Sequence, residues 1–161
     1  MKSQKPCAPD YLEVDQKLLK GTWFLRASNP NIFNTYKNFK ENLDERSIVG
    51  IKGNISALIR RSDKFRASTS TAMWSLEHDN LATVYQYDFK VVIGVCKIIS
   101  ADKEFFICQG GSQGLPDEHT VIRFRKECPD QKIMEKLAQA LKKVCLDVNN
   151  FSFDKSGCNS K

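Results

Sequence analysis

The sequence of 161 residues has no run of about 18 apolar residues, the length that a membrane-spanning helix requires. It also has no C-x-x-C pair, which weighs against a zinc site and against thioredoxin-like redox chemistry. Its first residues include lysines but no apolar stretch typical of a signal peptide, so we expect Met1 to be a start added to a mature chain. The length of 161 residues is sufficient to bury a core. Together with these absences it favours a single globular domain.

Basic residues outnumber acidic ones by 25 to 19, yet they form no continuous stripe. Acidic neighbours interrupt them, as in Lys40-Glu41. A groove that follows phosphates needs a continuous basic face, so we interpret the charge as a solvated surface and expect no nucleic-acid partner. The two histidines, His78 and His119, are isolated, and we expect both at the surface. We predict no metal and no cofactor.

Short segments with strand character follow one another from residue 21 to residue 126. Thr83, Tyr85 and Tyr87 alternate with period two, and the acidic turn Ala101–Glu104 joins two segments as in a hairpin. Eight short strands at nearly even spacing predict an all-β fold, either a closed antiparallel up-and-down β-barrel or a sandwich. The predicted strands are Gly21–Ser28, Tyr36–Leu43, Ser47–Leu58, Lys64–Trp74, Leu81–Phe89, Val91–Ser100, Phe105–Gly110 and His119–Lys126.

After the last strand the apolar period changes. Apolar residues recur every three or four positions from Ile133 to Val144, which predicts an amphipathic helix over Asp130–Cys145. An aspartate in its first turn and two lysines in its last turn suit the helix dipole. The short apolar segment Val148–Phe153 adds a possible further strand.

The even number of cysteines favours disulfides, and two sequons, at Asn54 and Asn150, permit glycosylation on a secretory route. Together they predict a secreted, disulfide-containing glycoprotein. The cysteines are Cys7, Cys96, Cys108, Cys128, Cys145 and Cys158.

Sequence does not fix the pairing, because six cysteines allow 15 connectivities. A straight helix of about 22 Å between Cys128 and Cys145 excludes a bridge between these two. A bridge between Cys145 and Cys158 is plausible because the tail between them can fold back, and Cys7 can reach Cys108 or Cys128.

A closed barrel has no free sheet edge and leaves an interior wide enough for one small ligand, but one end must be sealed. An indole at the start of the first strand serves this purpose, and Gly21 before Trp23 allows a sharp entry into the strand. An arginine from the end of the last strand can lie over the indole, a cation–π contact of about 0.5–2 kcal/mol. Arg123 and Arg125 are the candidates.

These residues resemble, in order, the signature motifs of the lipocalin family. Gly21-Thr22-Trp23 resembles the first motif. The turn that follows residue 100 resembles the second, a Thr-Asp-Tyr turn before an aromatic residue, of which Asp102 and the closing aromatic are retained. Arg125 before the helix resembles the third. The resemblance covers nearly the whole chain.

The resemblance implies one lipocalin-like domain with four parts: an arm over 1–17, a barrel over 21–126, a helix over 130–145 packed outside it, and a tail over 146–161. Both ends of the chain look most like insect lipocalins, such as those that cockroaches secrete as milk, as allergens, or onto male glands and cuticle. This implies a secreted carrier of a small hydrophobic ligand, such as a fatty acid, another lipid or a pheromone-like volatile. We expect a monomer or weak dimer without enzymatic activity. A nutritive or storage secretion is the alternative.

Strand parity predicts the residues that point into the barrel. With Ile122 and Phe124 under the helix, Val121 and Arg123 point inward, because neighbouring residues face opposite sides of a sheet. The same reasoning gives an apolar and aromatic lining, typical of small-ligand sites. The predicted inward residues are Leu25, Ala27, Phe39, Phe65, Met73, Tyr85, Tyr87, Val92, Cys96, Ile98, Phe105, Ile107, Gln109, Val121 and Arg123.

Two of these residues allow different roles. A buried Arg123 needs a partner. The partner is either a head group on the ligand or an interior acid such as Asp88 or Glu41, unless the side chain reaches solvent. Cys96 is either part of a disulfide or a thiol nucleophile of a lipid-acting enzyme, which would need a lowered pKa and a nearby base.

Overall fold

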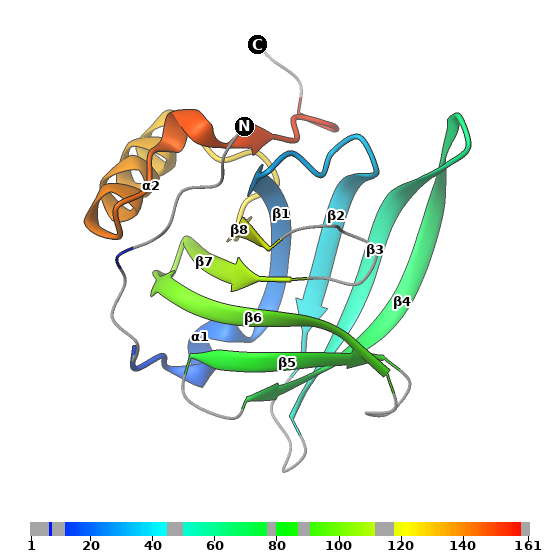
Figure 1. Cartoon of the computed structure of the whole chain (residues 1–161), viewed down its shortest axis with the longest axis horizontal. Helices are drawn as coiled ribbons and strands as arrows, with labels where there is room; N and C mark the ends of the chain where they lie inside the picture. Colours follow the sequence, from blue (N-terminus) through cyan, green and yellow to red (C-terminus); the bar gives the residue numbers. More distant parts are fainter. Residues whose placement is uncertain are drawn as a thin grey trace.

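The computed structural model describes residues 7, 12–44, 50–76, 80–86, 91–111 and 118–158. They form an antiparallel barrel with one long helix outside it, as the sequence predicts (Figure 1). The barrel strands are β1 (Gly21–Asn29), β2 (Tyr36–Leu43), β3 (Ile51–Arg61), β4 (Lys64–Leu76), β5 (Leu81–Gln86), β6 (Val91–Ala101), β7 (Phe105–Gly110) and β8 (His119–Phe124).

Each strand pairs with its neighbours in sequence, and β1 pairs with both β2 and β8, which closes the sheet. A short strand, β9 (Ser152–Phe153), adds to β1 opposite Ala27 and Ser28. A one-turn helix, α1 (Gln16–Leu19), precedes β1 and was not predicted. Its single turn is too short to give a helical period in the sequence.

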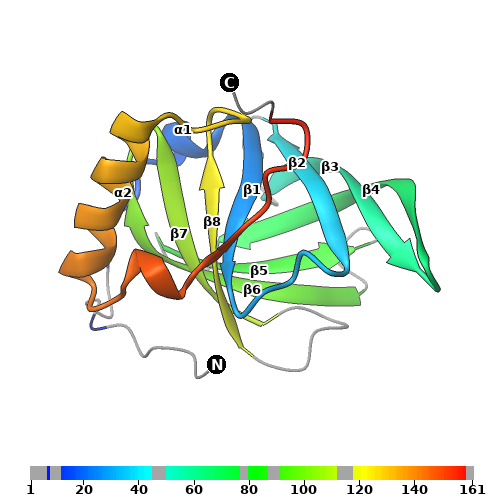
Figure 2. The same ribbon diagram turned by 90° about the horizontal axis from the view of Figure 1, so that it is seen from above.

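Helix α2 (Gln131–Lys143) matches the predicted amphipathic helix. The side chain of Asp130 accepts a hydrogen bond of 2.9 Å from the backbone N–H of Ile133, a normal N-cap. Ile133, Leu137 and Leu141 are buried against the outer face of the barrel. Figure 2 shows α2 along one side of the sheet, next to β7. The helix therefore covers an apolar outer face that would otherwise be exposed to water.

The apolar residues form two separate clusters, one inside the barrel and one beneath α2. Trp23, Trp74 and Phe106 belong to the inner cluster, and Phe105 and Phe124 to the outer one. None of the helices in the described ranges has both the length and the apolar character that crossing a bilayer requires.

The C-terminal tail is held by a buried arginine of β1. Arg26 is only 2% exposed, and its guanidinium lies 3.6 Å from the Asp154 carboxylate and 3.4 Å from that of Glu127. It also donates to the Ser156 carbonyl at 2.6 Å. The Asp154 carboxylate accepts two backbone hydrogen bonds in addition, from Asn38 at 2.8 Å and from Ser156 at 2.9 Å. Every described charge in this cluster has an opposite charge beside it, as buried ions require.

Replacing Asp154 by Asn tests this cluster. The amide keeps the size of the carboxylate but presents an N–H₂ group to donors, so we expect a loss of about 1.5–3 kcal/mol in the free energy of unfolding. Urea unfolding followed by circular dichroism measures it. Asp63→Asn, in the exposed β3–β4 turn, is the matched control and should change stability by about 0.5 kcal/mol or less. Equal effects of the two substitutions would contradict the role of Asp154.

All six cysteines form disulfides, which connect Cys7 to Cys145, Cys96 to Cys108, and Cys128 to Cys158. The suggested Cys145–Cys158 bridge and the suggested partners of Cys7 are therefore wrong. Cys145 follows directly after α2, where it meets the N-terminal arm, and the backbone N–H of Cys7 donates to the carbonyl of Val144 at 2.9 Å. The folding back of the tail brings Cys158 to Cys128 at the start of α2 instead.

Candidate ligand cavity

The closed end of the barrel is sealed by Trp23, as predicted. The indole is fully buried, its ring centroid lies 4.6 Å from that of Phe106, and its N–H donates to the carbonyl of Leu19 at 2.8 Å. The guanidinium of Arg125 lies 3.7 Å from the indole centroid. Burial lowers the pKa of this guanidinium. Gly21 has φ +110, a conformation that residues with a side chain rarely adopt, and a Cβ there would lie 2.7 Å from Nη1 of Arg125.

Above this seal lies a cavity of about 280 Å³, near the lower end of the range for small-ligand pockets (about 300–1,000 Å³). Most of its wall is apolar, and its polar groups are few. The apolar and small lining residues are Leu25, Ile32, Tyr36, Phe39, Ile55, Ala57, Ile59, Ser68, Ser70, Trp74, Val84, Ile93, Gly94, Val95, Cys96, Cys108, Gly110 and Val121, and the ionisable ones are Glu41, His119 and Arg123.

An acid and a base face each other on the cavity wall. Glu41 is 1% exposed and Arg123 is 9% exposed. The Nε atom of Arg123 lies 3.6 Å from Oε1 of Glu41, and Oε2 of Glu41 accepts a hydrogen bond of 2.9 Å from the indole N–H of Trp74. Of the alternatives for Arg123, pairing with an interior acid is therefore the one observed, and the acid is Glu41.

The electrostatics of this pair follow from its burial. Desolvation raises the pKa of Glu41, while the positive charge of Arg123 and the hydrogen bond from Trp74 lower it in part. Desolvation lowers the pKa of Arg123, and the negative charge of Glu41 opposes this shift. Each residue thus supports the charged form of the other in a place where a single ion would be costly.

The pair leaves hydrogen-bonding capacity unused. Arg123 Nε and Glu41 Oε1 have no hydrogen-bond partner among the described residues, since 3.6 Å is too long for such a bond. Arg123 otherwise donates to the sulfur of Cys108 at 3.7 Å, a weak acceptor. Aromatic rings surround its guanidinium, with centroids at 5.2 Å for Trp74 and 5.6 Å for Phe106. Both atoms are enclosed by protein and face each other, so the ion pair holds them in place of hydrogen bonds.

The structure brings together only some of the residues predicted to point inward. Ile98 lies in the inner core rather than on the cavity wall. Tyr87 lies outside the described residues, as do Asp88 and His78. The predicted residues that line the cavity are Leu25, Phe39, Cys96, Val121 and Arg123.

On β7 the predicted orientation is wrong by one residue. Phe105 pairs directly with Phe124, which packs under α2, so Phe105 and Ile107 face the helix. Phe106 and Cys108 take the inner face, and Gln109 is absent from the cavity wall. The reason is the strand register, which parity within a single strand does not determine.

On β6 a bulge reverses the orientation. Val84 pairs with Gly94 but Tyr85 pairs with Val92, so Ile93 is an extra residue. Ile93 and Gly94 both line the cavity, and Val92 is turned outward with 52% exposure. Tyr85 is likewise not part of the wall, because Val84 occupies the inner face of β5.

A second bulge affects β1. Leu25 pairs with Arg123 and Ala27 with Ile122, so Arg26 is the extra residue. Ala27 therefore lies in the outer cluster, contrary to the prediction.

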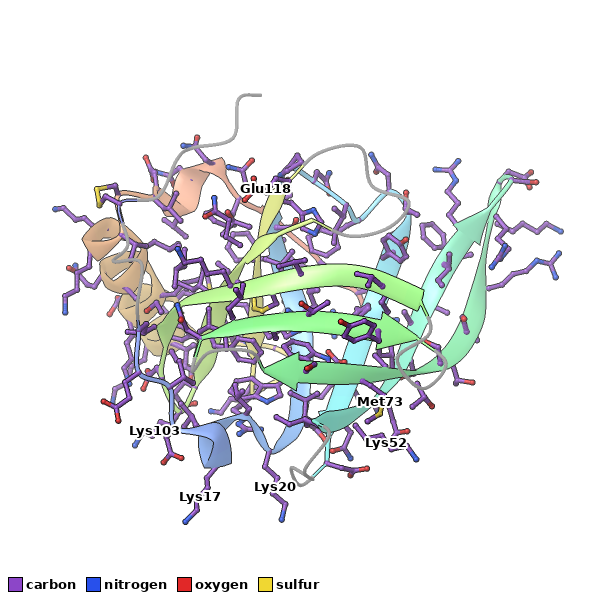
Figure 3. The ribbon with its side chains drawn as sticks, turned by 60° about the horizontal axis from the view of Figure 1, so that its bottom comes forward. Lys17, Lys20, Lys52, Met73, Lys103 and Glu118 are labelled. Carbon is purple, nitrogen blue, oxygen red and sulfur yellow. A yellow bond between two sulfur atoms is a disulfide. The ribbon has the colours of Figure 1, made fainter. Side chains whose placement is uncertain are left out.

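On β4 the predicted Phe65 and Met73 also point away from the cavity. Met73 pairs with the exposed Lys52, and Figure 3 shows the two side by side on the outside. Lys37 lies over the Phe65 ring at 4.5 Å. The inner face of β4 instead carries serines and Trp74. The prediction placed the apolar residues of this strand inside the barrel, whereas β4 places small polar residues there.

Two other expectations have clear outcomes. Cys96 is bonded to Cys108 in the cavity wall, so the hypothesis of a Cys96 thiol nucleophile is wrong. His119 is 6% exposed and lines the cavity, so its predicted surface position is wrong. Asp102 lies in the β6–β7 turn and pairs with Lys136 of α2 at 2.7 Å.

The sequon residue Asn54 is exposed, while Asn150 is half-buried, and glycosylation at both stays a prediction.

Sequence reasoning missed Trp74 and gave Glu41 only as one possible partner. A signal was present for both. Glu41 is the one acid in the strand YKNFKENL, whose charged and amide side chains are otherwise lysines and asparagines, and it has the same parity as Phe39. A tryptophan near the end of a strand rich in small residues, such as Trp74, is similarly a candidate for a buried position in the cavity wall.

Solved structures share this architecture. The cockroach major allergen Per a 4 is 14% identical, with a TM-score of 0.67 over 88% of this chain and 87% of that one. Lobster apocrustacyanin A1 is 14% identical, with a TM-score of 0.59 over 86% and 78%. A biogenic amine-binding protein is 12% identical, with a TM-score of 0.63 over 98% and 89%. The protein has the lipocalin fold. No protein-family model matches its sequence, and no curated protein sequence does either.

Proposed function

We propose that this protein is a carrier that holds a small hydrophobic molecule, such as a lipid or a volatile, in the barrel cavity. The observation that carries the proposal is the cavity itself, a hollow of about 280 Å³ with a mostly apolar wall, bordered by the inner apolar cluster of the barrel. A stable fold rarely leaves such a space unfilled without a use, because empty apolar volume costs stability. A ligand that fills it gains about 25 cal/mol for each Å² of apolar surface removed from water, less the cost of ordering.

Other features of the chain support secretion of the protein. Three disulfides favour an oxidising compartment, since such bonds are rare in the cytosol. The exposed sequon at Asn54 is compatible with glycosylation on that route. The neighbours in fold include a cockroach allergen, an apocrustacyanin and a protein that binds biogenic amines. We infer that the protein is secreted and that it binds and carries its ligand without converting it.

The proposal is tested by native mass spectrometry and organic extraction of the protein from its own source, followed by titration of tryptophan fluorescence with medium-chain lipids. Trp74 lies in the wall, so a bound ligand should change its emission. The expected result is one extractable hydrophobic molecule per chain and saturable binding. Absence of both would overturn the proposal.

A blocking variant tests the position of the site. Ala57 lines the cavity, so Ala57→Phe should place a ring in the hollow and weaken binding about tenfold or more, through loss of ligand contact area. Ala67 on the neighbouring strand is exposed and absent from the wall, which makes Ala67→Phe the matched control. If the control weakens binding as much as the cavity variant, the ligand does not lie in the barrel.

A further inference from the structure

The turn between β3 and β4 carries a dense group of positive charges. Residues 60–66, here called the basic hairpin tip, read RRSDKFR and hold four cations and one acid, a net charge of +3 in a chain whose total is +6. The cations are Arg60, Arg61, Lys64 and Arg66, and all four are exposed. None of them forms an ion pair with a carboxylate of the described residues. The basic hairpin tip is thus a local exception to the spread of basic residues along the sequence.

The basic hairpin tip projects from the molecule at the open end of the barrel. Figure 1 and Figure 2 both show the β3–β4 turn extending beyond the neighbouring strands, and Figure 3 shows it at the opposite end from α1. The two strands stay paired as far as Arg61 and Lys64, next to the turn. The backbone N–H of Arg60 also donates to the carbonyl of Thr35 at 2.8 Å, which fixes the hairpin to the segment before β2. The charges therefore sit on an ordered support.

The same hairpin forms part of the cavity wall. Ile59 lines the cavity and pairs directly with Arg66. Opposed residues of an antiparallel pair lie on the same face of the sheet, so Arg66 stands on the inner face, at the edge of the opening. Phe65 pairs with Arg60 on the other face, is partly exposed, and has the amine of Lys37 at 4.5 Å from its ring centroid. The basic hairpin tip thus combines cations on both faces with one aromatic ring beside the opening.

We propose that the basic hairpin tip docks this protein on the surface of an anionic lipid bilayer, with the opening of the cavity turned toward the lipid. Each Lys or Arg near such a surface raises the partition coefficient about fivefold. The attraction extends over the Debye length, about 10 Å in 0.1 M salt. Arg60 and Arg66 lie at most three residues from the turn Ser62–Asp63, about 10 Å along a strand. All four cations are therefore close enough to act together.

A bilayer fits this surface better than a sulfated polysaccharide does. Either polyanion attracts the cations, and Asp63 and the exposed Glu118 before β8 offset part of the attraction in both cases. The ring of Phe65 favours lipid, because an aromatic side chain at the headgroup boundary buries apolar surface. A bilayer is also a source of the apolar molecules that the proposed function places in the cavity. The docking goes beyond that function and does not depend on it, since the cations attract the surface whether or not the cavity is filled.

The test is cosedimentation of the native protein with two kinds of vesicle in 0.1 M salt at pH 7, one of phosphatidylcholine alone and one with about 30% phosphatidylserine. We expect a partition coefficient about tenfold or more higher for the anionic vesicles, and its loss in about 0.5 M salt, where screening shortens the Debye length. Equal partition to both vesicles would overturn the proposal. Binding to immobilised heparin without binding to the anionic vesicles would also overturn it and would identify a sulfated polysaccharide as the partner. None of these outcomes bears on ligand binding in the cavity, so the carrier function is tested separately.

Variants then assign the docking to the basic hairpin tip. Arg61→Gln/Lys64→Gln removes two charges next to the turn and should lower the partition coefficient about 25-fold. The matched control, Lys17→Gln/Lys52→Gln, removes the same charge from exposed positions at the opposite end of the barrel (Figure 3) and should change it about twofold or less. Arg61→Lys/Lys64→Arg keeps the charge and should bind like the native protein, because the attraction needs no bidentate geometry. Equal losses in the two glutamine variants would show that net charge alone drives the binding, and would contradict the role of the basic hairpin tip.

Discussion

Replacement of Trp23 by Ala should destabilise the protein by about 3–5 kcal/mol, the range for loss of a fully buried aromatic side chain. The indole has no exposed surface, and three neighbours depend on it. Phe106 loses its edge-to-face partner, the Leu19 carbonyl loses its donor, and Arg125 loses the ring beneath its guanidinium. The cavity left behind would lie at the sealed end of the barrel, where the backbone of α1 and β1 leaves little freedom to collapse.

Urea unfolding monitored by far-UV circular dichroism measures this loss without relying on the tryptophan signal. Phe65→Ala is a suitable control, because Phe65 is partly exposed on the outer face and its ring contacts a lysine. We expect a change of about 1 kcal/mol or less for it. A loss below about 1 kcal/mol for Trp23→Ala would mean that the indole is not the seal that the structure indicates.

Removal of the Cys7–Cys145 bridge should have the largest effect among the three disulfides. Its cysteines are 138 positions apart, against 30 for Cys128–Cys158. In the chain-entropy description the cost of closing the loop in the unfolded state grows with its length, which gives about 5 kcal/mol for the long loop and about 3.6 kcal/mol for the shorter one.

The measurement compares the double variants Cys7→Ser/Cys145→Ser and Cys128→Ser/Cys158→Ser under identical oxidising conditions. Both remove one bridge near an end of α2, so the pair is matched for chemistry and differs mainly in loop length. A greater loss for the shorter loop would contradict the entropic account and would assign the stabilisation to local contacts.

The sequence predicts much of the architecture because its signals are local or periodic. The heptad-like face of α2 and the eight runs of strand character need no knowledge of distant partners. Gly21, Trp23 and Arg125 were also identified correctly, since a sealed barrel end requires a bulky ring, a sharp entry and a cation at fixed points in the chain.

The cavity wall is predicted less well, and the errors have a common physical cause. Orientation alternates along a strand, so one inserted residue exchanges inside and outside for everything beyond it. The bulges at Arg26 and Ile93 do this to Ala27 and Val92, and the pairing of Phe105 with Phe124 does the equivalent for β7. Such registers depend on contacts with other strands and leave no mark in the composition of the strand itself.

The contact between Arg26 and the C-terminal segment has a mechanical consequence. β1 pairs with β2 only from Gly21 to Leu25, and β9 continues along the same edge of β1 at Ala27 and Ser28. The Asp154 carboxylate contacts Arg26 of β1 and accepts a hydrogen bond from the backbone N–H of Asn38 in β2, so the C-terminal segment connects the two strands where their own pairing ends. We therefore expect the guest to enter and leave through the open end of the barrel and not between β1 and β2.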